Sequence, residues 1–253
     1  MVLNLKTLKF FPLRTLVKAL HKLLSIPIIV SFSGLKIVFP PDMLDAVIRN
    51  IEHVMLDHEY MEYLISDCRT LLDIGAGIGI FTIYMNKLTK LNRVFLIEAN
   101  PELIPFIDLN LRLNNVDNYT ILNKAVCLSS STHATLYACK DSFASSLILS
   151  HVAMHCSHYK ELRVPCIDPS ILCSLMRRSD TVKIDVEGAE LATLRICRDA
   201  LTSVKNLVVE VHTDIADPHA IASLLESMNF NVVIHTSTES PYQITILAIN
   251  RRT

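Results

Sequence analysis

The stretch LLDIGAGIGIFTIY, residues 71–84, holds three of the chain's five glycines. An apolar run with Asp73 near its end precedes them, and apolar residues at helical spacing follow from Phe81 onward. A glycine inside an element costs about 0.5–1 kcal/mol relative to alanine, so three together need a reason, and a plain turn between strand and helix needs only one. Strand, glycine loop and helix in this order are typical of the nucleotide-binding turn of an open α/β sheet.

The composition favours one globular domain. The chain has 253 residues, of which 51% are hydrophobic, and a formal net charge of -1, so no global electric field attracts nucleic acid. Its seven cysteines are odd in number and form no CxxC pair. They therefore predict neither a disulfide framework nor a zinc knuckle, but small buried side chains in a reducing compartment.

The N-terminal segment differs from the rest in charge. Residues 1–41 contain six lysines and arginines and no acid. The bases alternate with apolar residues at roughly helical spacing, which is typical of an interfacial amphipathic helix, but a solvated helix that packs one apolar face on the domain is the favoured interpretation. The longest uncharged run is too short to span a bilayer, and no signal cleavage site is present. We expect a cytoplasmic protein, with residues 1–25 as the candidate for peripheral membrane contact.

The order of predicted elements indicates a Rossmann-like α/β fold. Residues 1–54 form a basic helical segment and a hairpin that turns at Ser33-Gly34, and residues 55–253 form the main domain. Strands are predicted at 70–75, 93–99, 119–126, 181–186 and 206–212, and helices at 80–90, 101–114, 188–200 and 217–228. Such alternation builds a parallel sheet with helices on both faces.

Two details of the sequence refine this order of elements. Asn100 and Pro101 predict the N-cap and first position of the helix at 101–114. The final stretch, residues 231–250, reads as two strands joined by a short polar turn. A hairpin of this kind is antiparallel, so the last strand is expected to run against the sheet.

Polar residues close five of these segments, where the carboxyl ends of the strands meet. They are Asp73 with the glycine loop, Glu98 with Asn100, Asn123 with Lys124, Asp185 with Glu187, and Glu210 with His212. Each alone is weak evidence, because strands commonly end in polar residues. Together they predict a ligand site at this edge.

The glycine spacing selects the ligand. A nicotinamide dinucleotide asks for G-x-G-x-x-G, but Ile80 stands where the third glycine would be, and no GK[ST] follows for a P-loop. The spacing is D-x-G-x-G-x-G, led by Asp73, and Glu98 is placed to accept both hydroxyls of a ribose. A cofactor with an amino acid and a sulfonium suits an acid at the loop. We predict S-adenosylmethionine.

Three segments resemble the FkbM-type family of class I S-adenosylmethionine-dependent methyltransferases: LLDIGAGIGIFTIYMNK (71–87), VFLIEANPELIPFIDLNLRLNNVDNYTILNKAV (94–126) and VKIDVEGAELATLRI (182–196). The resemblance covers roughly residues 55–235, and the third segment is the most specific. It implies a seven-stranded sheet whose last strand is antiparallel, and methyl transfer to oxygen, often on sugars or secondary metabolites.

The resemblance also implies roles for single residues. The methionine part of the cofactor would be held by Asp73, Gly75, Gly77 and Gly79. Glu98 would hold the ribose and the region of Asn123 the adenine, and we add Asn100 to the cofactor-binding set because it follows Glu98 at the same edge.

Three residues are candidates for catalysis. Period-two alternation places Lys183, Asp185 and Glu187 on one face of a strand. Asp185 is the first candidate for a base or acceptor clamp, with Glu187 beside it, although Asp185 could equally cap the next helix. His212 has a pKa suited to a general base, or is simply a polar strand end. Glu190 is expected at the surface or in the first turn of a helix.

The stretch HVAMHCSH, residues 151–158, has the i, i+4 histidine spacing that can hold a metal on a helix. It lacks the glutamate of HExxH, so we predict no metal and interpret it as part of a cap over the acceptor pocket that starts at the serines of residues 142–146. We predict that the acceptor is a hydroxyl of a sugar, glycan or small metabolite. The alternative is a tRNA methyltransferase, which the sequence disfavours because DVEG stands where base-nitrogen enzymes carry an N/D-P-P-[YF] tetrapeptide and no RNA-binding domain is appended.

Overall fold

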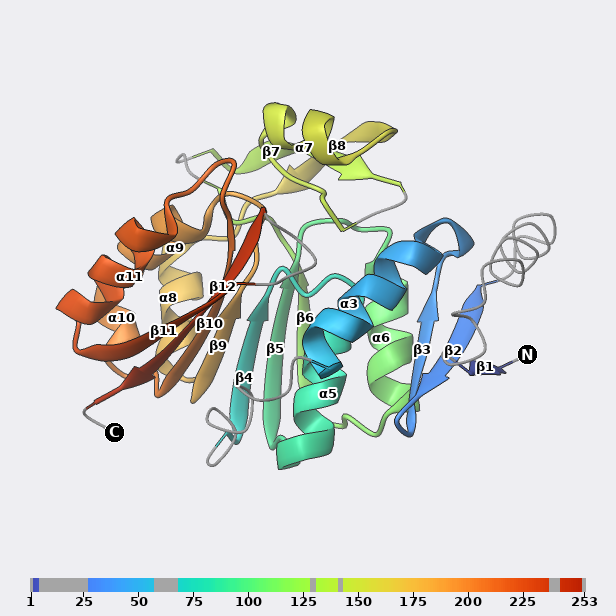
Figure 1. Ribbon diagram of the computed structural model, residues 1–253, viewed down its shortest axis with the longest axis horizontal. Helices are drawn as coiled ribbons and strands as arrows, with labels where there is room; N and C mark the ends of the chain where they lie inside the picture. The colour runs from blue at the N-terminus through green and yellow to red at the C-terminus, as the bar shows by residue number, and fades with distance from the viewer. Residues whose placement is uncertain are drawn as a thin grey trace.

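The computed structural model describes residues 2–4, 27–56, 68–127, 131–140, 143–236 and 242–251. In this part of the chain seven strands form one sheet in the order β11-β12-β10-β9-β4-β5-β6 (Figure 1). Their bounds are β4 Thr70–Ile74, β5 Arg93–Glu98, β6 Tyr119–Asn123, β9 Thr181–Ile184, β10 Asn206–His212, β11 Phe230–Thr236 and β12 Gln243–Asn250. The chain crosses over between β4 and β9, so the sheet has a topological switch point there.

The sheet is parallel except at its C-terminal edge. Strand β12 pairs antiparallel with both β10 and β11, as the sequence predicted for the last strand. The five strands predicted before it are all present, and their ends lie within about three residues of the predicted ones. The Rossmann-like seven-stranded fold is confirmed.

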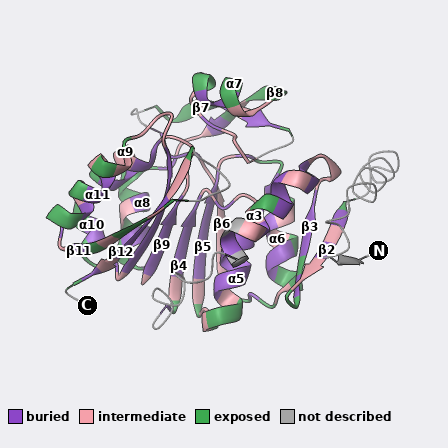
Figure 2. Cartoon of the chain, in the orientation of Figure 1, coloured by how far each residue is buried: buried purple, intermediate pink, exposed green. Residues whose placement is uncertain are grey.

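Helices cover both faces of the sheet because neighbouring residues of each strand point to opposite sides. In β4, Leu71 belongs to one buried cluster and Leu72 to the other. One face carries α3 (Leu44–Leu56), α5 (Ile80–Thr89) and α6 (Ile104–Leu113); the other carries α8 (Pro169–Arg177), α9 (Glu190–Ile196), α10 (Arg198–Leu201) and α11 (Pro218–Ser227) (Figure 1). The central strands are buried along most of their length (Figure 2).

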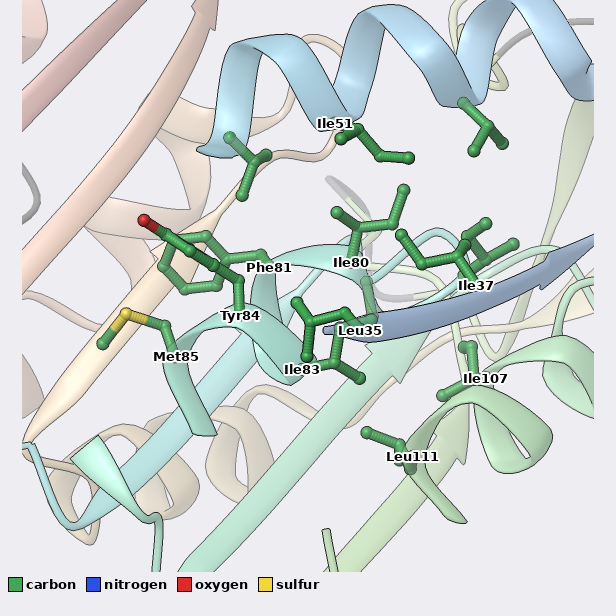
Figure 3. Packing of buried hydrophobic residues seen from close by; sticks show 14 of the residues in the cluster. Leu35, Ile37, Ile51, Ile80, Phe81, Ile83, Tyr84, Met85, Ile107 and Leu111 are labelled. Atoms are coloured by element: carbon green, nitrogen blue, oxygen red, sulfur yellow. The ribbon is translucent and has the colours of Figure 1, made fainter. Parts of the chain in front are cut away.

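The predicted N-terminal hairpin is present and packs on the first of these faces. Strands β2 (Ile28–Phe32) and β3 (Leu35–Phe39) turn at Ser33-Gly34, and β1 (Val2–Asn4) pairs with β2. Side chains of β3, α3, α5 and α6 meet in one core (Figure 3). Asn110 of α6 is fully buried there, exchanges two hydrogen bonds with the backbone of Val38 and donates a third to the carbonyl of Ile78. The division into residues 1–54 and 55–253 stays a prediction.

Two helix predictions need correction. The helix expected at 101–114 begins at Ile104 with Leu103 as its N-cap, so Asn100 and Pro101 do not start it. Asn100 instead accepts a hydrogen bond from the backbone N–H of Glu102 in the turn before the helix. The helix predicted at 188–200 is two short helices, α9 and α10, which meet at Cys197.

The cysteine prediction is wrong. Within the described residues, which include all seven cysteines, three disulfides join Cys127–Cys166, Cys139–Cys156 and Cys173–Cys197, and Cys68 is free and buried. The partners are 39, 17 and 24 residues apart, and only the tertiary fold brings them together. Disulfides persist in oxidising compartments, so the cysteines no longer support a reducing one.

A small cap lies over the carboxyl ends of the strands. It consists of the antiparallel pair β7 (His133–Cys139) and β8 (Tyr159–Pro165) with α7 (Leu149–His155) between them (Figure 1). One disulfide, Cys139–Cys156, closes it. No helix in the described part of the chain is long and apolar enough to cross a membrane. The basic helix predicted in LKTLKFFPLRTLVKALHKLL, residues 5–24, lies outside the described residues.

Candidate active site

The glycine loop between β4 and α5 lies directly against the end of β9. Gly75 has a φ of 78°, and a Cβ at this position would lie 1.5 Å from the backbone oxygen of Asp185. The N–H groups of Gly75 and Ala76 both donate to the carbonyl of Ile97, at 2.8 and 3.1 Å. No side chain fits between these segments, so the first glycine of the loop is required by the contact of the two strand ends.

Glu98, the last residue of β5, has its carboxylate fixed by backbone donors. Its two oxygens accept from the N–H groups of Gly77 and Asn100, each at 2.8 Å. The side-chain amide of Asn123 donates to the backbone carbonyls of Glu98 and Ala99 and so braces the same turn. Burial raises the pKa of Glu98 to about 7, although the two N–H donors favour the ionised form.

Asp73 lies beneath the loop and not in it. It is fully buried, and Oδ2 accepts from the hydroxyl of Thr82 at 2.7 Å while Oδ1 has no hydrogen-bond partner among the described residues. The ammonium of Lys183 lies 3.8 Å from Oδ1, 2.9 Å from Oδ2 of Asp185 and 3.1 Å from the carbonyl of Gly75. Burial raises the pKa of Asp73 despite this lysine.

A pocket opens between the loop, the end of β5, the cap and the end of β9. Of the predicted cofactor residues, Gly75, Gly77 and Glu98 line it, and Asp185 and Glu187 line its other side. Its remaining ionisable lining residues are Lys124, Lys183 and Glu210. Asp73, Gly79, Asn100 and Asn123 are not among the lining residues and lie behind them. His212 lies behind Glu187 in the same way.

The carboxylates of Asp185 and Glu187 do not lie on one face as predicted. Strand β9 ends at Ile184, so the alternation of side chains does not continue to these residues. Asp185 pairs with Lys183, whereas Glu187, with a φ of 51°, reaches His151 and His212. The helix that follows begins at Glu190 with Ala189 as its N-cap, so Asp185 does not cap it. The geometry therefore leaves Asp185 in the pocket wall.

Glu187 is the centre of a buried chain of imidazoles and carboxylates. Its Oε2 lies 2.6 Å from Nε2 of His151 in the cap and 3.0 Å from Nε2 of His212 at the end of β10. The two Nδ1 atoms contact Asp214 at 2.7 Å and Glu190 at 3.3 Å. Although burial opposes protonation, Glu187 and Glu190 raise the pKa of His212 well above its usual value.

Comparison with known proteins identifies the chain. The model of the family "Methyltransferase FkbM domain" matches residues 73–232, more than half of the sequence. The chain belongs to the FkbM methyltransferase family. The family resemblance predicted from the three sequence segments is thereby confirmed, and the matched region begins at Asp73 and includes the glycine loop, Glu98 and the whole of DVEG.

Individual relatives are distant. "Methyltransferase 1" of Beauveria bassiana is 25% identical over 210 residues, which cover 75% of this chain and 83% of the relative. Among solved structures, magnesium protoporphyrin IX methyltransferase from Synechocystis, with bound SAM, has 12% identity and a TM-score of 0.47 over 82% of this chain and 83% of that one. A SAM-dependent methyltransferase from Aquifex aeolicus has 11% identity and a TM-score of 0.43 over 79% and 92%. Identities this low say nothing about a shared substrate.

The structure of the FkbM domain adds residues to the site that the sequence did not assign to it. His151 was interpreted as part of the cap, and no spacing rule places it against Glu187, 36 positions away. Glu190 is fully buried in the first turn of α9, which settles its two predicted positions in favour of the helix turn. The position of Lys183 on the same face as Asp185 was predictable from their alternation along the strand, but the burial of the Lys183 side chain was not.

Proposed function

We propose that this FkbM-family protein transfers a methyl group from S-adenosylmethionine to a hydroxyl oxygen of a sugar, glycan or small metabolite. The observation that carries the proposal is the wall of the pocket. Glu98, held by two backbone N–H groups, stands on one side, and Asp185 and Glu187 stand on the other. A carboxylate fixed in this way can accept both hydroxyls of a ribose.

The charges of the pocket support this cofactor over a dinucleotide. Four carboxylates line it (Glu98, Asp185, Glu187 and Glu210) against two lysines, Lys124 and Lys183. These acids suit a ligand with an ammonium and a sulfonium, whereas a pyrophosphate would add negative charge beside them. When bound, the cofactor supplies an activated methyl group.

The protein must then align the acceptor and remove its proton. Asp185 is the better base, because it lines the pocket and one of its oxygens is not engaged by the described residues. His212 is a poor base, because its two ring nitrogens face Glu187 and Glu190 and the residue does not line the pocket. Its part would be to hold Glu187 in place as an acceptor clamp.

Two measurements test the proposal. S-adenosylmethionine, and not NADH, is expected to raise the melting temperature, and Glu98→Ala should remove most of that shift. Asp185→Asn should lower turnover far more than cofactor affinity, because the base acts only in the transfer step. Stabilisation by NADH alone would overturn the proposal.

The acceptor is tested separately. The protein is incubated with labelled S-adenosylmethionine and, in turn, with lipid-glycan, small-metabolite and RNA fractions of its host. We expect label in a hydroxylated glycan or metabolite. Label found only in RNA would replace this acceptor with the tRNA alternative and leave the cofactor assignment standing.

A further inference from the structure

We propose that His151, Glu187 and His212 form a binding site for a divalent metal ion of the zinc type. Their ligand atoms, one from each side chain, all lie within 4.8 Å of one another. The three residues come from separate segments: α7 of the cap, the turn after β9 and the end of β10. Two imidazoles and one carboxylate are an established ligand set for zinc.

The surroundings of the two histidines are those of metal ligands. Imidazoles that bind a metal usually hold their second nitrogen to a carboxylate, which fixes the ring and its tautomer. Here Nδ1 of His151 contacts Asp214 at 2.7 Å, and Nδ1 of His212 contacts Glu190 at 3.3 Å. Both rings are thereby held with Nε2 close to the same atom, Oε2 of Glu187.

The distances leave room for an ion after a small adjustment. The two Nε2 atoms lie 2.6 and 3.0 Å from Oε2 of Glu187. Metal bonds of about 2.0–2.1 Å in a tetrahedral site separate the ligand atoms by about 3.3 Å. Side-chain rotations that move these atoms apart by several tenths of an ångström would therefore bring them to metal-binding positions.

A second observation favours a cation at this position. Nε2 of His212 is buried and makes no hydrogen bond within the described residues, although Glu187 is 3.0 Å away, and Oδ1 of Asp214 is likewise buried without one. Three carboxylates, Glu187, Glu190 and Asp214, surround the two imidazoles, and His155 contacts Asp214 at 3.4 Å. With His151 and His212 unprotonated, as metal ligation requires, the cluster has a net negative charge. Uncompensated buried charge is costly, and a divalent ion would offset it.

The position of the ion would matter for the reaction. Glu187 lines the cofactor pocket on the side of Asp185. Three protein ligands would leave the fourth position of a tetrahedral ion to a water molecule. Because Glu187 is the one of the three that lines the pocket, an ion bound there would fix the position of this carboxylate in the pocket wall. This consequence rests on the proposed function, whereas the metal site itself does not.

Titration of the untagged, disulfide-bonded protein with Co²⁺ in the absence of cofactor tests the site. We expect one ion per chain and the intense visible absorption of a four-coordinate site. His151→Ala and Glu187→Gln should each weaken binding by more than about 100-fold, and Asp214→Ala, which removes only a supporting contact, by about 10–100-fold.

Two matched substitutions distinguish this site from other ways of binding Co²⁺. His155→Ala, on the same helix and beside Asp214, should leave binding unchanged, as should His219→Ala on an exposed surface. Circular dichroism of each variant shows that the variant is folded, and stabilisation by S-adenosylmethionine tests the cofactor assignment independently. Absence of Co²⁺ binding, or equal binding by His151→Ala, would overturn the proposal and leave a metal-free chain of hydrogen bonds.

Discussion

Replacement of Gly75 by alanine is expected to destabilise the protein more than any other single methyl group added to the glycine loop. The new Cβ would lie 1.5 Å from the backbone oxygen of Asp185 and 2.7 Å from its carbonyl carbon. Neither partner can move alone, because Asp185 N–H donates to Ile74 at 2.9 Å and Gly75 N–H donates to Ile97 at 2.8 Å. Relief of the clash therefore requires β4 and β9 to separate.

The magnitude follows from two contributions. A non-glycine residue in the left-handed region costs about 1–2 kcal/mol. The overlap with the backbone also costs contacts between two central strands. The total loss in the free energy of unfolding should therefore exceed about 4 kcal/mol, a large part of the 5–15 kcal/mol that stabilises a typical domain. The loop that would shift also carries Gly77, whose N–H holds the carboxylate of Glu98, so cofactor affinity should fall as well.

Gly34→Ala and Gly79→Ala separate the two contributions. Both glycines have similar φ angles, 81° and 83°, but a Cβ at Gly34 would have no atom within 4 Å and one at Gly79 only ordinary contacts at 3.8 and 3.9 Å. Each should cost about 1–2 kcal/mol in urea unfolding followed by circular dichroism and fluorescence, with the disulfides intact. If Gly75→Ala lost no more stability than these two, the close contact with Asp185 would not be what requires glycine.

Two further predictions concern Glu98 and the cysteines. Burial raises the pKa of Glu98 to about 7, and ribose hydroxyls would favour its ionised form, so the affinity for S-adenosylmethionine should be constant above about pH 7 and fall by up to tenfold per pH unit below it. Calorimetry from about pH 5.5 to 8.5 measures this dependence, and Glu98→Gln should abolish it. An affinity independent of pH in the unaltered protein would contradict the prediction. Alkylation of the protein unfolded without reductant should modify one cysteine of seven, Cys68, and the six others only after reduction; modification of all seven without reductant would show that the disulfides are absent.

The sheet was predictable because its signals are local. Leu71 and Leu72 face opposite layers whatever lies beyond them, and the apolar runs that include them end in polar residues where the strands end. The hairpin at Ser33-Gly34 is likewise fixed by its turn residues. Asn100 did not predict the start of the helix, because its side chain can accept a hydrogen bond from the backbone in a turn as well as at an N-cap. Pro105 stands in the first turn of the actual helix.

The contacts made by the cap were not predictable, since they join residues far apart in the sequence. Cys127 and Cys166 are separated by 39 residues, and His151 and Asp214 by 63. No period or spacing within either segment depends on the other. The same limit explains why Glu187 was expected to point with Asp185: the alternation that places them together holds only while the strand continues, and β9 stops at Ile184.

The positions of the glycines have a physical explanation in addition to cofactor binding. Three of the five stand where a distant segment comes close: Gly75 against Asp185, Gly77 with its Cβ position 3.2 Å from the ring of Phe143, and Gly188 with its Cβ position 2.7–2.8 Å from side chains of Ile215 and Ile148. Phe143 and Ile148 lie on either side of Ser146 in the sequence. The hydroxyl of Ser146 donates a hydrogen bond to the carbonyl of Glu187 at 2.6 Å.

The segment that leads into the cap therefore approaches both the glycine loop and the turn after β9 at glycine positions, where an added Cβ would force neighbouring side chains to shift. Ser146 and His151 hold the backbone and the carboxylate of the same residue, Glu187, in a left-handed conformation that a non-glycine residue rarely adopts. Strain of this kind persists only where surrounding contacts enforce it. A change at Ser146 or His151 would thus alter the position of Glu187, which lines the pocket opposite Glu98, whereas a change at Phe143 would act on Gly77, whose N–H is one of the two donors to Glu98.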